Sequence, residues 1–138
     1  MGGRITFPLG SLYHGTKFSV EGISESLRYE VEQIGCKVKI IEPGMIATDF
    51  SGRSFDFHHD VNLSEYQKIV DKISTAFTEM IKKASPASIV ADLIYEAATD
   101  GKNKLRYIAG NDAKAFILFK KLFGYNFIVG MNKKFFKL

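Results

Sequence analysis

The sequence is poor in the features that would place it in several specialised classes of protein. Its 138 residues include a single cysteine, Cys36, which excludes an internal disulfide. Cys36 follows Gly35 at a predicted helix end, and we expect a small buried thiol there and not a nucleophile. The segment after Met1 lacks the apolar core of a signal peptide, and no apolar run approaches the roughly 18 residues of a membrane span. These absences make a cytoplasmic location the expectation.

The composition is that of an ordinary globular chain. Hydrophobic residues make up 46% of the sequence, and the length suits one domain. The sequence contains no internal repeat and no low-complexity linker. The fold class therefore has to come from the order of the predicted helices and strands.

The net charge of +4 is unevenly distributed. From Ala113 onward there are lysines and no acidic residues, so the rest of the chain is slightly acidic. We therefore divide the sequence into a body, residues 1–112, and a basic, aromatic tail, residues 113–138. We favour a tail that packs on a substrate pocket or a partner subunit. Peripheral contact with an anionic membrane surface is an alternative, because basic residues interleaved with Phe suit it. No nucleic-acid partner is expected, because no recognised motif accompanies the charge.

Hydrophobic periodicity predicts an alternation of helices and strands. A long amphipathic helix over residues 12–34 carries an apolar stripe for burial and ends at Gly35. A strand over residues 38–42 follows, and a helix followed by a strand in this pattern is half of a βαβ unit. The remaining predictions are a helix over 64–83 that opens with a capping box from Ser64 to Gln67, a helix from Ser85-Pro86 to Gly101, a strand over 105–110, and a tail that is helical at first and then irregular.

The long helix carries two residues that suit proton transfer. Tyr13 and Lys17 are four residues apart, so their side chains share one helix face at the rim of the apolar stripe. A nearby ammonium favours the ionised form of a phenol, which makes Tyr13 a proton donor and Lys17 its tuner. The spacing alone also fits two half-exposed surface residues, so the neighbouring sequence has to decide.

That neighbouring sequence resembles the active-site helix of the short-chain dehydrogenase/reductase family. The resemblance rests on Gly3-Arg4, Pro8, Ser11, Tyr13, Lys17 and the run from Phe18 to Arg28, and on the segment Ile41–Thr48, which is similar to the family's P-G-x-x-x-T element. It covers most of the chain and weakens after about Lys114. It implies an α/β fold, namely the C-terminal part of a Rossmann-like doubly wound parallel sheet with about two strands and four helices.

The resemblance implies an NAD(P)-dependent oxidoreductase that transfers a hydride between nicotinamide and a carbonyl or alcohol substrate. In that family Tyr13 would be the general acid/base, and Lys17 would favour the ionised phenol and hold the ribose hydroxyls of NAD or NADP. The residues implied to contact the nicotinamide end of the cofactor are Pro43, Gly44, Ile46 and Thr48. The Thr48 hydroxyl would lie near the carboxamide, and the alternative for Thr48 is a capping residue before a polar loop.

Residues 49–63 resemble, by position, the family's variable substrate loop. Phe50, Phe55 and Phe57 could line an apolar pocket or form a lid packed on the core, so we expect an apolar or bulky small-molecule substrate. His58 and His59 are adjacent, and the sequence places no acidic residue or Cys at a recognisable ligand spacing from them, so no metal site is expected. The family's Tyr–Lys helix often joins a helix bundle between subunits, which implies a homo-oligomer.

Two family features are absent from the 138 residues. No glycine-rich turn joins a strand to a helix to cradle a pyrophosphate, and the family's catalytic Ser would fall just before Met1. The sequence is therefore interpreted as the C-terminal half of a dehydrogenase. The alternatives are an inactive fragment, whose apolar helix face and strand at 38–42 are uncovered, or a dimerising interaction module.

Overall fold

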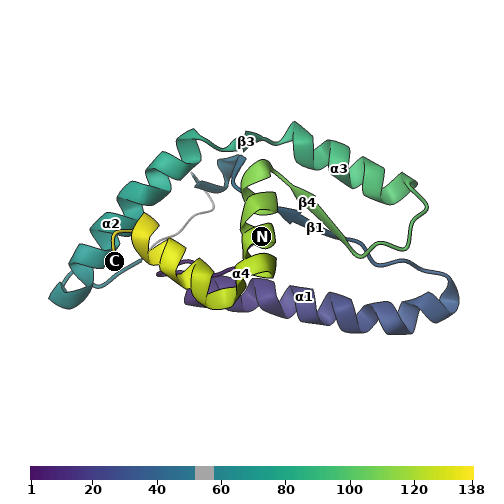
Figure 1. Ribbon diagram of the computed structural model, residues 1–138, viewed down its shortest axis with the longest axis horizontal. Helices are drawn as coiled ribbons and strands as arrows, with labels where there is room; N and C mark the ends of the chain where they lie inside the picture. The colour runs from purple at the N-terminus through teal and green to yellow at the C-terminus, as the bar shows by residue number, and fades with distance from the viewer. Residues whose placement is uncertain (52–57) are drawn as a thin grey trace.

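The computed structural model describes residues 1–51 and 58–138. Within these ranges the protein is an α/β molecule with four α-helices and two short parallel sheets (Figure 1). The elements in chain order are α1 (Ser11–Val31), η1 (Glu32–Ile34), β1 (Ile40–Pro43), β2 (Ile46–Ala47), η2 (Asp49–Ser51), α2 (Ser64–Lys82), β3 (Ser85–Pro86), α3 (Ser88–Thr99), β4 (Arg106–Ala109) and α4 (Asn111–Phe135). The predicted fold class is confirmed.

Strands β1 and β4 pair in parallel, with Ile40 opposite Arg106 and Pro43 opposite Ala109. Strands β2 and β3 form a second, two-residue parallel pair. Because β1 and β4 run the same way, their carboxyl ends meet at one edge. Ligands in open α/β sheets bind at that edge, so the segments that follow Pro43 and Ala109 define where a site would lie.

Helix α1 ends as the sequence predicts. Gly35 adopts the left-handed conformation, with φ of 78°, and its N–H donates to the Glu32 carbonyl at 3.1 Å. The N–H of Cys36 donates to the Val31 carbonyl at 3.0 Å, which completes the turn. The Cys36 side chain is exposed, so the predicted buried thiol is wrong. After this left-handed turn, residues 35–37 are exposed, and β1 then begins at Ile40.

The apolar stripe of α1 lies open to solvent. Leu12 is 86% exposed, and Val20, Ile23, Leu27 and Ile34 are also exposed. The predicted uncovered helix face is therefore confirmed, because no described segment covers this stripe. The strand is different, since Ile40 and Glu42 are buried where β4 and α3 pack against β1. The expectation that this strand is uncovered is wrong for these two residues.

Helix α2 begins at Ser64 without the predicted capping box. Leu63 is the N-cap residue, and the Ser64 hydroxyl donates to the neighbouring Glu65 carboxylate at 3.4 Å instead of capping the helix. The amide of Gln67 donates to the carbonyl of Asp60 at 3.2 Å, so it bonds the preceding turn. Helix α3 also starts later than predicted, at Ser88, because Ser85–Pro86 pairs with β2 as strand β3.

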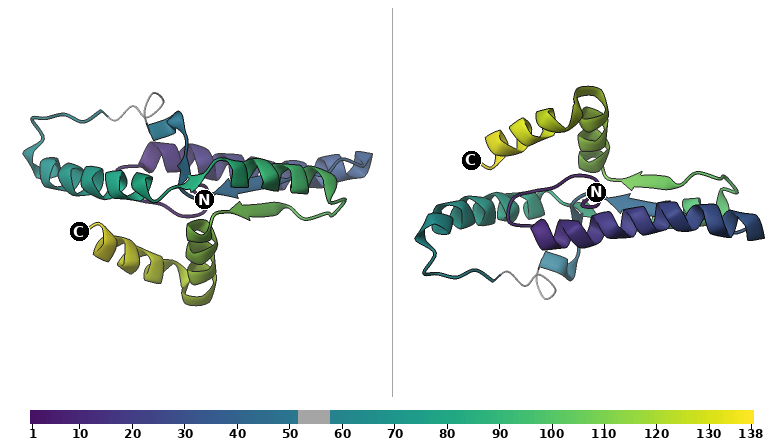
Figure 2. Two further views of the ribbon diagram at one scale, coloured as in Figure 1. Left: turned by 90° about the horizontal axis from the view of Figure 1, so that it is seen from above. Right: turned by 90° about the horizontal axis from the view of Figure 1, so that it is seen from below.

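Helix α4 runs through nearly all of the tail, so the predicted irregular end is wrong. Its one non-helical residue is Gly124, with φ of 78° and ψ of −178°, which bends the helix. The side views show α4 leaving the layer of the other helices on one side (Figure 2). The division of the chain into body and tail at residue 112 stays a prediction.

The inner face of α4 packs on the N-terminal segment. The Phe7 ring lies 6.0 Å from the rings of both Phe116 and Phe136. The Asn132 amide donates to the Thr6 carbonyl at 2.9 Å. The buried apolar residues that surround these contacts and the β1–β4 pair include Ile5, Ile40, Tyr107, Ala109, Ala113, Ile128 and Phe136. This core joins the start of the chain to its end and holds the first turns of α1 in place.

Candidate active site

Tyr13 and Lys17 lie on the first two turns of α1, and both residues are exposed. The Lys17 Nζ atom is 5.6 Å from the centroid of the Tyr13 ring, and Tyr13 is 45% exposed. The structure thus brings the two predicted residues together on one helix face. Their arrangement permits a phenol and an ammonium to face the same bound molecule.

His14 is a buried neighbour of Tyr13 that the sequence pattern does not predict. Its side chain is 5% exposed, and its Nε2 atom accepts a hydrogen bond from the Phe7 N–H at 2.9 Å. Because Nε2 is an acceptor, Nδ1 is the donor, and it donates to the Gly2 carbonyl at 2.8 Å. The neutral ring therefore fastens the segment from Gly2 to Phe7 against the first turn of α1.

The turn after β1 is fixed by the start of α4. The Gly44 N–H donates to the Ala109 carbonyl at 2.8 Å, and the Met45 N–H donates to Asp112 Oδ2 at 2.7 Å. A Cβ atom at Gly44 would overlap the Asp112 carboxylate, so a larger residue there requires the carboxylate to move from its hydrogen bond with Met45. The predicted cofactor residues Pro43 and Gly44 thus belong to a backbone held by a residue far away in sequence.

Thr48 and Phe50 follow this turn, and Phe50 lies close to Tyr13. Thr48 is exposed, and its hydroxyl oxygen accepts a hydrogen bond from the Phe50 N–H at 3.3 Å, which is the capping contact expected as an alternative. Its own O–H remains able to donate. The Phe50 ring is 6.2 Å from the Tyr13 ring. Ile46 is half-buried in β2, and Phe55 and Phe57 lie outside the described residues.

A buried carboxylate lies directly before the turn. Glu42 is 1% exposed, and its Oε1 atom is 3.0 Å from Arg4 Nη1 and 3.2 Å from Arg106 Nε. Arg106 also pairs with Glu21 at 3.1 Å and with Glu25 at 2.8 Å. Burial, with the neighbouring Glu42 carboxylate, raises the pKa of Glu21. This ionic cluster ties α1, β1, β4 and the N-terminal segment together beneath the candidate site.

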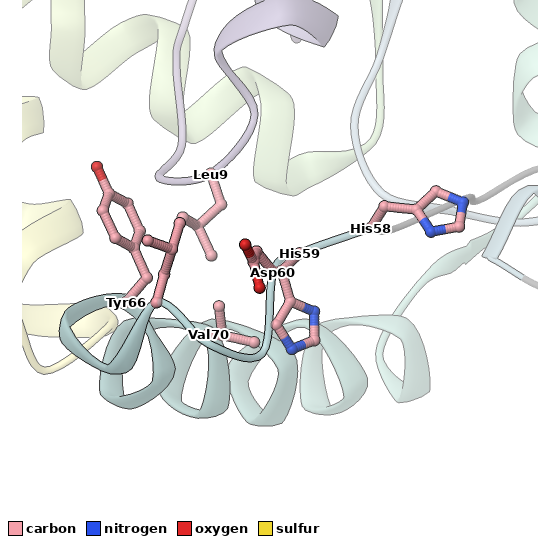
Figure 3. A pocket seen from close by; sticks show the side chains of 7 residues that line it. Leu9, His58, His59, Asp60, Tyr66 and Val70 are labelled. Carbon is pink, nitrogen blue, oxygen red and sulfur yellow. The ribbon is translucent and has the colours of Figure 1, made fainter.

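A pocket of about 210 Å³ opens between the turn before α1 and helix α2 (Figure 3). Its lining residues are Leu9, His58, His59, Asp60, Leu63, Tyr66 and Val70. In Figure 3 the His58 ring points away from the rings and side chains around His59. Among residues 1–51 and 58–138, no group of three or more His, Cys, Asp and Glu side chains is placed to hold a metal ion.

A second, more open hollow of about 560 Å³ lies on the first turns of α1. Its lining residues are Thr6, Phe7, Pro8, Leu9, Ser11, His14, Gly15 and Phe18. Leu9 lines both hollows and adopts a left-handed backbone, with φ of 60°, which is uncommon for a bulky side chain. The strained turn at Leu9 therefore separates two apolar hollows close to the Tyr–Lys helix.

None of the helices in residues 1–51 and 58–138 is long and apolar enough to cross a bilayer.

The described fold places the carboxyl edge of a parallel α/β strand pair and a Tyr–Lys helix in one chain, as the family resemblance implies. Comparison with known proteins agrees, since the model of the short chain dehydrogenase family matches residues 1–59. The chain belongs to the short-chain dehydrogenase/reductase family.

Three relatives illustrate the similarity. An uncharacterised oxidoreductase of Schizosaccharomyces pombe is 44% identical over 111 residues, which cover 80% of this chain and 46% of the relative. The 17-beta-hydroxysteroid dehydrogenase type 6 of Mus musculus is 32% identical over 127 residues, which cover 84% of this chain and 40% of the relative. The NADPH-dependent 3-dehydrocapnine reductase of Ornithobacterium rhinotracheale is 32% identical over 106 residues, which cover 77% of this chain and 38% of the relative. The chain thus spans about half the length of the curated relatives it matches, or somewhat less.

Proposed function

We propose that this chain forms part of an NAD(P)-dependent oxidoreductase that interconverts an alcohol and a carbonyl compound. The observation that carries the proposal is the proximity of Tyr13 to η2, the segment that follows β2, with the Tyr13 and Phe50 rings 6.2 Å apart. Lys17 lies on the same face of α1 as Tyr13. The names of the mouse dehydrogenase and of the NADPH-dependent reductase among the relatives support this class of reaction.

The residues on this face suit a nicotinamide dinucleotide. The Lys17 ammonium and the Thr48 hydroxyl are exposed donors, and they suit ribose hydroxyls and a carboxamide respectively. The backbone from Pro43 to Thr48 lies at the carboxyl edge of the sheet, where such ligands bind. When bound, NAD or NADP would supply or accept the hydride, and the protein would provide orientation and electrostatics.

Tyr13 moves the proton in the proposed reaction. Its phenol donates a proton to the substrate oxygen during carbonyl reduction, and the phenolate takes a proton from the alcohol in the reverse direction. Lys17, with its Nζ atom 5.6 Å from the ring centroid, places a positive charge near the developing phenolate. His14 is proposed as a positioning residue, because it holds residues 2–7 against the helix turn that carries Tyr13.

The substrate is proposed to be an apolar or bulky small molecule. The apolar wall of the pocket before α2 is made by Leu9, Leu63, Tyr66 and Val70. These side chains offer a hydrophobic surface close to the start of α1. His59 and Asp60 form the polar part of the same lining and would orient a polar group of the substrate.

The proposed activity belongs to a protein that also supplies two groups absent from these 138 residues. These are the glycine-rich pyrophosphate turn and the Ser that the family resemblance implies. We place this protein in the cytoplasm, as the sequence predicts.

The proposal is tested by nucleotide binding to the protein isolated from its native source. We expect NADH or NADPH to bind, and Lys17→Met to weaken the affinity about tenfold because a charge-assisted hydrogen bond is lost. The matched control is Lys83→Met, an exposed lysine at the end of α2, which should leave the affinity unchanged. Failure of both nucleotides to bind would overturn the proposal.

Self-association through α1 is a second candidate role, and the exposed apolar stripe favours it. Ile23 and Leu27 are exposed on this helix although both are large and apolar. We expect a dimer in sedimentation velocity that Ile23→Ser with Leu27→Ser converts to a monomer. A wild-type protein that sediments as a monomer would contradict this role.

A further inference from the structure

The bend of α4 carries a continuous group of exposed apolar side chains. We call it the α4 corner, and it consists of Leu118, Phe119, Leu122, Phe123, Tyr125 and Phe127. Leu122 is 62% exposed and Phe123 is 57% exposed. Large apolar side chains that gather on one exposed surface mark an interaction site more often than scattered ones do.

Three aromatic rings of the α4 corner form a cluster within this chain. The rings of Phe123 and Phe127 lie 4.7 Å apart, and the Phe119 ring is 6.3 Å from the first and 6.2 Å from the second. Gly124 lies between them with its left-handed φ of 78°, so residues on both sides of the bend join one cluster. The cluster therefore needs no rearrangement to meet a flat apolar layer.

The opposite face of α4 is already occupied by this chain. Phe116 and Phe136 contact the Phe7 ring, and Asn132 bonds the Thr6 carbonyl. The α4 corner consequently points away from the body. Figure 2 shows the bend of α4 as the part of the helix that extends farthest from the layer of α1, α2 and α3.

Charge distinguishes the α4 corner from the other exposed apolar surface. The exposed lysines of the tail are Lys114, Lys121, Lys133, Lys134 and Lys137. The last acidic residue of the chain is Asp112, and its carboxylate is turned to the Met45 N–H. The apolar stripe of α1, by contrast, has exposed carboxylates beside it at Glu25 and Glu30. An anionic surface would attract the α4 corner and would repel those carboxylates of α1.

We propose that the α4 corner rests on the surface of an anionic lipid bilayer. Its aromatic rings lie at the level of the headgroups, and the flanking lysines contact acidic headgroups. Tyr125 has an amphipathic ring that favours the headgroup layer, and the Phe and Leu side chains bury apolar area at its boundary with the acyl chains. The contact is peripheral and leaves the layer of α1, α2 and α3 on the side of α4 that faces away from the membrane. It does not depend on the proposed oxidoreductase activity.

The test uses one fluorescent reporter, because the sequence contains no tryptophan. In the full chain, Phe123→Trp is titrated with vesicles of phosphatidylcholine alone and of phosphatidylcholine with phosphatidylserine. We expect the tryptophan fluorescence to shift to the blue on binding and to be quenched by brominated lipid. Partitioning into the anionic vesicles should be at least about tenfold stronger than into the neutral ones, and it should weaken with added salt. The control reporter is Tyr29→Trp on exposed α1, which should stay in water while the protein is bound.

Two matched pairs of substitutions separate this surface from nonspecific adhesion. Lys133→Gln with Lys134→Gln should lower partitioning roughly tenfold, whereas Lys82→Gln with Lys83→Gln, a lysine pair at the end of α2, should leave it unchanged. Leu122→Ser with Phe127→Ser, which keeps the reporter at position 123, should lower it by at least about tenfold. The proposal is overturned if the wild-type chain ignores anionic vesicles, if both lysine pairs act equally, or if only the reporter at position 29 shifts. The proposal is also overturned if the protein self-associates through the α4 corner and does not bind vesicles.

Discussion

The carboxylate of Asp112 accepts a hydrogen bond from the backbone N–H of Met45 at 2.7 Å. Asp112 stands at the start of α4 and Met45 in the turn after β1, 67 residues earlier. The other oxygen of Asp112 is buried without a hydrogen-bond partner among the described residues, at the point where a side chain on Gly44 would collide with it. The last helix thus sets the backbone of the turn that is proposed to meet the cofactor.

Asp112→Ala tests this link. Removing the carboxylate leaves the half-buried Met45 N–H without its acceptor, so we expect the free energy of unfolding to fall by about 1–3 kcal/mol. Urea unfolding measures the loss. Asp92→Ala, at an exposed position of α3, is the matched control and should change stability little. Equal stability of the two variants would show that the hydrogen bond does not hold the turn.

A second prediction compares two glycines. Gly44→Ala places a methyl group on the Asp112 carboxylate, and we expect a loss of about 2 kcal/mol or more, because the turn and the carboxylate cannot both keep their places. Gly22→Ala, in the middle of α1 with open space around it, should raise stability by about 0.5–1 kcal/mol. Thermal unfolding of both variants decides, and a harmless alanine at position 44 would contradict the close approach.

The long helix and its end could be predicted because their causes are local. Apolar residues recur at helical spacing along α1, and Gly35 provides the left-handed residue that stops it. The roles of Asp112 and Glu42 could not be predicted, because their partners lie 67 and 38 residues away. Only the fold brings those groups together.

The second half of the tail was mispredicted for a different reason. Gly124 and Gly130 interrupt the apolar spacing there, and this interruption predicts an irregular segment. In the structure Gly130 continues the helix, and Gly124 bends it without ending it. The capping box at Ser64 was mispredicted because Asp60, four residues earlier, already organises the turn.

His14 provides a third prediction. The Phe7 N–H donates to Nε2, so we expect the ring to carry its proton on Nδ1. Nitrogen chemical shifts of the ring report this directly. His14→Ala should lower the free energy of unfolding by about 2 kcal/mol, because it leaves the Phe7 N–H and the Gly2 carbonyl unpaired. A ring protonated on Nε2 would contradict the geometry.

The pair of Lys39 and Asp100 predicts a dependence of stability on pH. Lys39 Nζ lies 2.7 Å from Asp100, and the hydrogen bonds from Lys39 and Tyr107 hold the pKa of that carboxyl well below its usual range. A carboxyl with a lowered folded-state pKa adds stability above its unfolded pKa of about 3.9, and this contribution disappears as the pH falls toward the folded value. The wild type should therefore melt above Asp100→Asn at neutral pH, and the gap should shrink below about pH 4.

At alkaline pH the contribution of the same pair to stability changes in the opposite direction, because it falls as the pH rises. The hydrogen bond to Asp100 raises the pKa of Lys39, so its contribution is complete below the unfolded value of about 10.4 and is lost as the pH rises through the folded value. Glu79→Gln, which removes the exposed pair with Lys82, is the control and should show almost no such dependence. A melting difference between wild type and Asp100→Asn that is constant from acid to alkaline pH would contradict this explanation.

The most direct test of the proposed function is the turnover of the native-source protein carrying Tyr13→Phe. The phenylalanine keeps the ring beside Phe50 and removes only the hydroxyl that carries the proton, so we expect kcat to fall about 10²–10⁴-fold while nucleotide affinity stays at the wild-type value. Tyr29→Phe, at an exposed position of the same helix, should leave both quantities unchanged. Full turnover with Tyr13→Phe would remove Tyr13 from the mechanism and contradict the proposed function of this helix.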